Sequence, residues 1–565
     1  MKILLIYPRC LEPRSHELYS QDAGVTPIGL YYLGALLMSR GHQVEILNWY
    51  QVEQSSREVR EILLEKKPDL VGFSIVNANR FGALDTAGLV REVLPGTVTV
   101  FGGIGATFLW EHLLKNFAQV DYVLLGEGEF SLLHLVSRLE SGETASLEDV
   151  KGLAFRRNSD TVCTGFPEPI QDLDQLPSPA RYFTFQHLVS SRGCPSNCSF
   201  CGSPGFWGRK VRFHSPEYFV NMLHELYNKG VTFFFVSDDT FTLKPSRVIE
   251  ICRLIIKRGL KISWFAISRV NCVDEEMLIW MRRAGCIQIS YGIESGSPEI
   301  RKALNKKISN QEIQTAFKQT VGCGILARAY FIYGSPGETR ETIQESMDLI
   351  ERIKPLSAVF YILEMFPGTA LYRDFKDRSR IDDDFWLKKV EHIKYFETDP
   401  GMSPEMVLEF GHMLRKCYYQ TLPRAARDIN LKDLPKLYPL HADFLSRLGM
   451  TFSHGDYSSI QEIPDKEETA EILFKKSLAY HPNERAYLGL GIIKQKQGRY
   501  REALDQLSRG MELFPDSENL AACQCISCMN LGRFQDALQH INRFPDSHQL
   551  QKFRQACSQA LGGKG

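Results

Sequence analysis

The sequence lacks the features that mark several special classes of protein. It has no excess of charge of either sign, because 67 Lys and Arg residues balance 67 Asp and Glu residues. Bulk charge therefore gives no reason to expect binding to nucleic acid or to an acidic membrane surface. No apolar run approaches the length of about 18 residues that predicts a transmembrane helix. The short apolar start, Met1–Pro8, has no small-residue cleavage site after it, so a secretory signal is not expected either.

Cysteine is also scarce, with 14 residues in a chain of 565. That is too few for a disulfide scaffold, so we expect reduced thiols and a cytoplasmic protein. In such a protein, clustered cysteines indicate a metal site before they indicate a disulfide. The hydrophobic content of 44% and the charged content of 24% are typical of globular proteins. At about 100–200 residues per domain, the length predicts three or four domains.

The N-terminal part, residues 1–140, is predicted to be a doubly wound α/β domain of the Rossmann-like type. Short runs rich in Val, Ile and Leu alternate with helical stretches, which is typical of parallel strands buried on both faces. In such sheets, ligands bind at the carboxyl ends of the strands. Residues 141–182 have no long periodic segment and end in a Pro/Ser-rich stretch, which favours a linker. The expected strands are Lys2–Tyr7, Gln43–Leu47, Leu70–Val76, Thr97–Phe101 and Tyr122–Leu125.

The alternation of strands and helices resumes in residues 183–375 and runs for six cycles. Six β/α units are two fewer than a complete (β/α)8 barrel has. We therefore expect a partial, open (β/α)6 TIM barrel. Its expected strands are His187–Ser191, Thr232–Ser237, Ile262–Ile267, Ile287–Gly292, Arg328–Tyr333 and Ala358–Leu363.

The C-terminal part is predicted to be all-α, with a helical extension over 376–464 and repeats over 465–565. The segments Gly498–Leu504 and Gly532–Leu538 match at a spacing of 34 residues. A 34-residue helix–turn–helix period is the tetratricopeptide signature, and about three units are visible. The repeats would form a small array that binds a protein or peptide. The alternative is that they only cap the enzyme or mediate self-association.

One short segment carries a distinct chemical signal, because Cys194, Cys198 and Cys201 follow the first barrel strand with the spacing C-x3-C-x2-C. Thiolate ligands select zinc or iron–sulfur. A closed zinc site needs four ligands, and neither His187 nor His214 is close in sequence. Three thiolates on a [4Fe–4S] cluster would leave one iron open to an external ligand.

This spacing resembles the signature of the radical S-adenosylmethionine (SAM) enzymes. Further segments resemble that family in the same order: Phe235–Thr242, Ile289–Ser297, Arg328–Thr339 and Phe366–Thr369. The resemblance implies that the open iron binds SAM and that one-electron reduction yields a 5′-deoxyadenosyl radical. It also implies a one-electron donor such as flavodoxin or ferredoxin, and an anaerobic or protected setting.

Four residues match positions that the family directs toward SAM. Asp238 and Asp239 end the second barrel strand, where the resemblance implies acceptors for the SAM amine, and a buried ammonium needs such acceptors. Glu294, on the fourth strand, resembles the acidic residue directed toward SAM. Arg328, on the fifth, could face the SAM carboxylate. For Asp238, Glu294 and Arg328, the alternative is a satisfied ion pair at a strand end.

A doubly wound domain before such a barrel resembles the cobalamin-binding subgroup of this superfamily. That subgroup includes the anaerobic magnesium-protoporphyrin cyclase and cobalamin-dependent methylases. Glycines after strands let a ligand approach the backbone closely. The D-x-H-x-x-G motif that supplies a histidine to cobalt is absent, and Ser15–Glu17 does not fit it. Many relatives also lack it, so we expect cobalt without a lower histidine; the alternative is a domain that has lost cobalamin. The expected cobalamin-binding residues are Thr26, Gly29, Gly102, Gly103, Thr107, Gly126 and Glu127.

The resemblance favours cobalamin-dependent methylation of an unactivated carbon. Anaerobic oxidative cyclisation is the second possibility, and a tetratricopeptide scaffold with a vestigial barrel is a third. The substrate would be a small molecule or a peptide, and no catalytic residue is assigned. A second cysteine triplet, Cys523, Cys525 and Cys528, lies in a predicted helix, where 525 and 528 share a face and 523 does not. We interpret these three as core or surface thiols.

Overall fold

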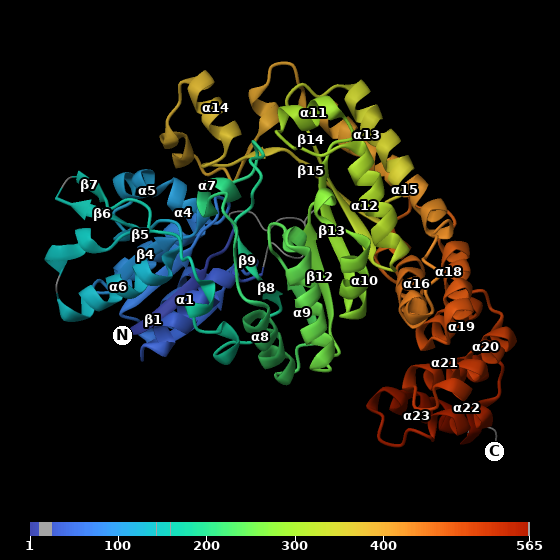
Figure 1. Ribbon diagram of the computed structural model, residues 1–565. Helices are drawn as coiled ribbons and strands as arrows, with labels where there is room; N and C mark the ends of the chain where they lie inside the picture. The colour runs from blue at the N-terminus through green and yellow to red at the C-terminus, as the bar shows by residue number, and fades with distance from the viewer. Residues whose placement is uncertain (11–24, 143, 159, 563–565) are drawn as a thin grey trace.

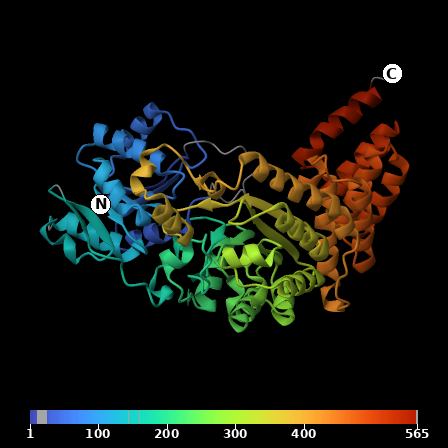
Figure 2. The same ribbon diagram turned by 90° about the horizontal axis from the view of Figure 1, so that it is seen from above.

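The computed structural model describes residues 1–10, 25–142, 144–158 and 160–562. Figure 1 shows three parts in sequence order: an N-terminal domain in blue and cyan, a central sheet with helices in green, and a helical arm in orange and red. Seen from above, in Figure 2, the arm projects away from the N-terminal domain. The molecule is therefore elongated, with its two ends far apart.

The N-terminal sheet has the strand order β2-β1-β3-β4-β5-β6-β7 among the described residues. Strands β1 to β5 are parallel, as predicted. The order 2-1-3-4-5 places a topological switch point between β1 and β3, where ligands of doubly wound sheets bind. The strands are β1 Lys2–Tyr7, β2 Gln43–Asn48, β3 Leu70–Ser74, β4 Val98–Gly102, β5 Tyr122–Leu124, β6 Leu153–Arg157 and β7 Asp160–Cys163; the helices are α1 Ile28–Ser39, α2 Ser56–Lys66, α3 Arg80–Val93, α4 Ile104–Phe108, α5 Trp110–Asn116 and α6 Gly128–Ser141.

The expectation of a linker over 141–182 does not hold for residues 153–157 and 160–163. There β6 pairs antiparallel with β5, and β7 pairs antiparallel with β6, so that the hairpin extends the sheet. Leu153, Ala154 and Phe155 are buried against the domain. The hairpin is short and lies at the sheet edge, so it leaves no long periodic pattern in the sequence.

The central sheet has the order β15-β14-β13-β12-β11-β8, and all of its strand pairs are parallel. It is the expected partial barrel, because each predicted strand is present and β8 does not pair with β15. The strands are β8 His187–Leu188, β11 Phe233–Val236, β12 Ser263–Ser268, β13 Cys286–Glu294, β14 Leu326–Tyr333 and β15 Ser357–Ile362; the helices are α7 Ser203–Trp207, α8 Pro216–Asn228, α9 Pro245–Lys257, α10 Glu275–Arg283, α11 Pro298–Ala303, α12 Asn310–Gly322 and α13 Arg340–Ile353. The short hairpin β9 Ser191–Arg192 and β10 Arg212–Phe213 stands outside this sheet.

Residues 364–396, here called the strap, return from the barrel to the N-terminal domain. The strap contains β16 Glu364–Met365, α14 Ala370–Ser379 and β17 Ile393–Lys394. Its apolar side chains share one core with α3 and α5 of the N-terminal domain, and Figure 1 shows α14 beside α4 and α5. The buried Arg80 guanidinium donates to the carbonyl oxygens of Trp386 and Lys388 at 3.2 and 3.0 Å. No role was predicted for most of this segment, yet it holds the N-terminal domain against the barrel.

The helical arm forms a series in which each helix packs on its neighbours. Two helix pairs repeat with a period of 34 residues, because α19 and α21 start at 484 and 518, and α20 and α22 start at 500 and 534. Cys525 and Cys528 are buried in one cluster with Cys557, while Cys523 packs against a different cluster, as the helical spacing predicted. The helices are α15 Pro404–Arg427, α16 Tyr438–Ser453, α17 Asp456–Ser459, α18 Lys466–Tyr480, α19 Glu484–Lys496, α20 Tyr500–Leu513, α21 Glu518–Asn530, α22 Phe534–Ile541 and α23 His548–Gly562.

Candidate functional site

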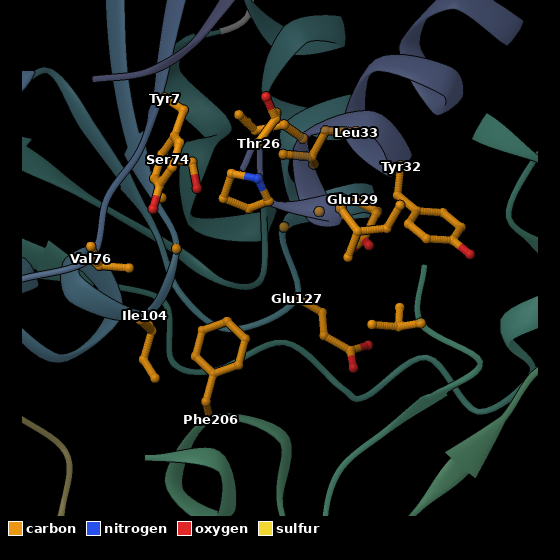
Figure 3. Close-up of a pocket in the computed structure, with 18 of the residues that line it drawn as sticks. Tyr7, Thr26, Tyr32, Leu33, Ser74, Val76, Ile104, Glu127, Glu129 and Phe206 are labelled. Atoms are coloured by element: carbon orange, nitrogen blue, oxygen red, sulfur yellow. The ribbon is translucent and has the colours of Figure 1, made fainter. Parts of the chain in front are cut away.

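A cavity of about 630 Å³ lies between the N-terminal domain and the barrel. It opens at the switch point between β1 and β3, where Leu5, Tyr7 and Ser74 form part of its wall. On the barrel side its wall includes Val189 after β8, Asp239 after β11 and Ile267 near the end of β12. Figure 3 shows Phe206 of α7 pointing into the cavity from the side opposite Thr26 and Leu33. One cavity therefore joins the strand ends of both domains.

Six of the seven residues predicted to bind cobalamin line this cavity: Thr26, Gly29, Gly102, Gly103, Gly126 and Glu127. Thr107 is buried beneath them instead. Its hydroxyl donates to the Gly103 carbonyl oxygen at 2.9 Å and accepts from the Gly126 N–H at 3.0 Å. Thr107 thus connects the two glycine loops that follow β4 and β5. Gly103 and Gly126 have φ angles of 90° and 62°, which residues other than glycine rarely adopt.

The cavity has the properties that a cobalamin site needs. Its sheet side is apolar, with Leu5, Val100 and Leu124 in the wall, and apolar walls suit the large ring of such a ligand. A Cβ atom added at Gly29 would meet no atom within 4 Å, so the glycine leaves open space at the start of α1. Among the described lining residues of the N-terminal domain there is no histidine. His16 lies outside the described residues.

The three clustered cysteines lie in the loop between β9 and β10, here called the cysteine loop (residues 193–211). Cys198 is buried, and Cys194 and Cys201 are half-buried. Burial raises the pKa of Cys198 and raises that of Cys201 to about 11. The positive charges of Lys306 and Arg269 oppose the effect at Cys198, and they would compensate the negative charge of thiolate ligands.

The three thiols could hold a metal group only as a set. Within the described residues, no three His, Cys, Asp or Glu side chains close on a single metal site. A [4Fe–4S] cluster binds each thiolate to a different iron, so its ligands are farther apart than those of one zinc ion. Three thiols on one short loop fit such a [4Fe–4S] cluster.

The acids predicted after β11 have different surroundings. Asp239 lines the cavity, and the Ser203 hydroxyl donates to it at 2.5 Å. Asp239 is exposed at the cavity, and the surrounding protein atoms partly desolvate its carboxyl, which raises the pKa of that group. Asp238 is buried and accepts from the Ser190 backbone N–H and from the hydroxyls of Ser190 and Ser191 at 2.5 to 2.7 Å. Asp238 therefore fixes the chain before the cysteine loop, while Asp239 is the acid that a ligand can reach.

The other two residues predicted to bind SAM also differ from each other. Glu294 is buried at the carboxyl end of β13, where Lys306 Nζ donates to it at 2.7 Å. Its φ of 67° is a strained angle for a residue with a side chain. It lies near Cys198, because its charge raises the pKa of that thiol. Arg328 is the third residue of β14 and donates to the Ser357 hydroxyl at 3.0 Å. This places it in the amino-terminal half of its strand, away from the end where the other predicted residues gather.

Several charged residues at the site were missed by sequence reasoning. Glu129 stands next to the predicted Glu127, and Arg192 precedes Cys194 by two residues. Arg192 contacts both glutamates, at 3.7 Å to Glu127 and 2.5 Å to Glu129. Arg212 also pairs with Glu127. The only signal in the sequence was the position of these residues beside the glycine loop and the cysteines.

Comparison with known proteins identifies the family. The radical SAM superfamily matches residues 188–350, and the B12 binding domain matches residues 22–136. An uncharacterized methyltransferase from Pyrococcus horikoshii is 32% identical over 435 residues, which cover 74% of this chain and 92% of that protein. The chain belongs to the radical SAM superfamily. It is an enzyme with a radical SAM domain and a B12-binding domain, and the predicted [4Fe–4S], SAM and cobalamin cofactors are those of its two domain families.

Other similar proteins include both predicted types of enzyme. The anaerobic magnesium-protoporphyrin IX monomethyl ester cyclase of Cereibacter sphaeroides is 29% identical over 437 residues, covering 73% of this radical SAM enzyme and 68% of the cyclase. The structure of the methyltransferase TsrM from Kitasatospora setae with cobalamin and a [4Fe–4S] cluster has a TM-score of 0.61 at 17% identity, covering 85% and 99% of the two chains. The enzyme OxsB with aqua-cobalamin has a TM-score of 0.59 at 15% identity, covering 100% and 84%. The two structural likenesses confirm the fold.

Two further predictions can be compared with the structure. Each helix among the described residues is too short or too polar to cross a membrane, in agreement with the sequence. The tetratricopeptide identity of the repeats stays a prediction, although the 34-residue period is present in the helices.

Proposed function

We propose that this enzyme methylates an unactivated carbon atom of a small-molecule or peptide substrate, with cobalamin as the methyl carrier. The observation that carries the proposal is the single cavity that joins the switch point of the N-terminal sheet to the strand ends of the barrel. A carrier bound on one side and SAM bound on the other would face the same space. Methyltransferases among the similar proteins support this outcome.

The chain's own residues would position the reactants. Cys194, Cys198 and Cys201 would hold the cluster, and Asp239 would accept hydrogen bonds from the SAM ammonium group. When bound, the cofactors supply a 5′-deoxyadenosyl radical and a transferable methyl group. Phe206 points into the cavity and would help to keep water away from the reacting groups.

Oxidative cyclisation is the second candidate, because the magnesium-protoporphyrin cyclase is similar over most of this chain. The same cavity would then serve a cofactor set that abstracts hydrogen without transferring a methyl group. A scaffold with a vestigial barrel is a weaker candidate, since a scaffold has no need for three clustered thiols and an acid facing a cavity.

The proposal includes the surroundings in which the enzyme works. An oxygen-sensitive cluster and reduced cysteines favour a cytoplasmic location and a one-electron donor such as flavodoxin or ferredoxin. The helical arm would recruit a protein partner, as tetratricopeptide repeats do. The balanced charge favours no nucleic-acid partner.

Anaerobic reconstitution with iron and sulfide tests the proposal. The protein is incubated with SAM, hydroxocobalamin and a strong reductant, and the products are analysed by mass spectrometry. We expect 5′-deoxyadenosine, methylcobalamin and S-adenosylhomocysteine from the wild type. Cys198→Ala should abolish 5′-deoxyadenosine, whereas Cys252→Ala, a buried thiol of the barrel core, should not. Deoxyadenosine without methylcobalamin would favour cyclisation, and no cleavage of SAM by a cluster-loaded protein would favour the scaffold.

A further inference from the structure

Four buried charged side chains connect the N-terminal domain to the cysteine loop. Glu127 and Glu129 lie at the start of α6, directly after the glycine loop that lines the cavity. Arg192 and Arg212 lie on β9 and β10, the two strands that bracket the cysteine loop. All four side chains are only 4 to 5% exposed. We call this set the clamp.

The clamp consists of two ion pairs, and two aromatic rings contact one of its guanidinium groups. Arg192 donates to Glu129 at 2.5 Å, and Arg212 donates to both carboxylate oxygens of Glu127. The Arg192 guanidinium also lies between two rings, 5.4 Å from the centre of Tyr32 and 5.3 Å from that of Trp207.

The hairpin that carries the cysteine loop depends on these glutamates. Its strands have two residues each, and Arg192 is directly opposite Arg212 in the antiparallel pair. Like charges directly opposite each other destabilise such a pair. Two buried cations without partners would be more costly still. The hairpin is therefore stable in this form only when the start of α6 is in place.

Three of the four clamp residues also line the cavity proposed to bind cobalamin. Glu127, Glu129 and Arg192 are part of its wall, and Gly126 and Gly128 beside the glutamates line it too. A ligand that orders the start of α6 would consequently order the hairpin, and a cluster that orders the cysteine loop would order α6. Linkage requires that such an effect be equal in both directions.

We propose that the clamp couples the two cofactor sites, so that cobalamin binds more tightly when the [4Fe–4S] cluster is in place and the cysteine loop is less accessible when cobalamin is bound. The coupling rests on the placement of the cofactors in the proposed function and not on which group is transferred. Glu127, Glu129, Arg192 and Arg212 are in this view positioning residues.

The first test measures the Kd of hydroxocobalamin for the full-length chain with and without a reconstituted cluster, by anaerobic equilibrium dialysis. We expect a ratio of about tenfold, within the range of roughly 5- to 150-fold that is typical of coupled sites. Glu129→Gln should bring the ratio close to one. Asp443→Asn should leave it unchanged, because Asp443 pairs with the buried Arg282 at 3.0 Å far from the cavity. A wild-type ratio near one, or an unchanged ratio in Glu129→Gln, would overturn the proposal.

A second measurement needs no variant, in case Glu129→Gln fails to fold. The cluster-free wild type is alkylated with iodoacetamide, and peptides are quantified by mass spectrometry. Hydroxocobalamin should slow the modification of Cys194 and Cys201, while Cys523, a half-buried thiol of the helical arm, should react at its original rate. Unchanged rates at all three would contradict the coupling. Neither readout requires turnover, so a failure of methyl transfer and a failure of the coupling are distinguishable.

Discussion

The open space at Gly29 offers a direct test of where cobalamin binds. Gly29 is the second residue of α1 and lines the cavity, and an added Cβ atom would meet nothing within 4 Å. Gly29→Leu would therefore add a side chain beside a cavity of about 630 Å³, and its Cβ atom would meet no other atom of the protein. The substitution also removes the cost of a helical glycine, which is about 1 kcal/mol. We therefore expect Gly29→Leu to fold as the wild type does and to bind cobalamin more weakly.

The size of the effect follows from the cost of crowding. Extra methylene groups in a well-packed site cost about 1–3 kcal/mol. At about 1.4 kcal/mol per tenfold change, the Kd of hydroxocobalamin should rise by roughly 5- to 150-fold. The thermal midpoint of the cofactor-free protein should stay level or rise.

The assay is equilibrium dialysis with hydroxocobalamin, followed by absorbance. Gly88→Leu is the matched control, because Gly88 is a helical glycine of α3 that also has no atom within 4 Å of an added Cβ, and it does not line the cavity. We expect Gly88→Leu to bind as the wild type does. Equal Kd values for Gly29→Leu and the wild type would refute the placement of cobalamin in this cavity.

Three further substitutions test separate parts of the argument. Arg80→Ala leaves strap carbonyl groups without their donor, so it should lower stability by about 3 kcal/mol and speed tryptic cleavage near Trp386; an unchanged digestion pattern would contradict this. Burial raises the pKa of Glu338 from 4.5 to about 7. The free energy of unfolding therefore falls as pH rises from 4.5 to 7. In urea unfolding at pH 5 and pH 8, Glu338→Gln should remove roughly 3 kcal/mol of that fall. A variant with the pH dependence of the wild type would argue against this. Cys201→Ala should reduce the iron bound per chain, while Cys525→Ala, in the repeats, should not; iron loss in both would point to a second cluster.

Strands buried on both faces could be predicted well from the sequence. β1 matches its predicted range, and β11 and β12 lie within two residues of theirs, because a continuous apolar run is itself the signal of such strands. The hairpin of β6 and β7 could not be found in this way. It lies at the antiparallel edge of the sheet. Its pairing with β5 depends on tertiary contacts, which leave no periodic pattern in the local sequence.

The position of the candidate site could be predicted from the sequence, but most of the contacts between its residues could not. Gly102 and Gly126 follow strands, so the topology alone brings them to the same edge. The roles of Asp238 and Asp239 could not be separated from the sequence. Only the fold shows that Ser190 and Ser191 donate hydrogen bonds to the carboxylate of Asp238. Arg192 and Glu129 are 63 residues apart, and no short motif joins them.

The strap has a consequence for how the enzyme is made. Asn77, in the N-terminal domain, donates to the Glu391 carbonyl oxygen across a sequence separation of 314 residues. The ribosome completes the N-terminal sheet long before it reaches the strap. At about 5–20 residues per second, the strap follows α6 after roughly 12–50 s. During that interval the strap does not yet hold the N-terminal domain to the barrel, so cobalamin can reach the N-terminal side of the cavity before the two domains are joined. Loading during synthesis and loading of the finished protein are therefore two different kinetic problems for this chain.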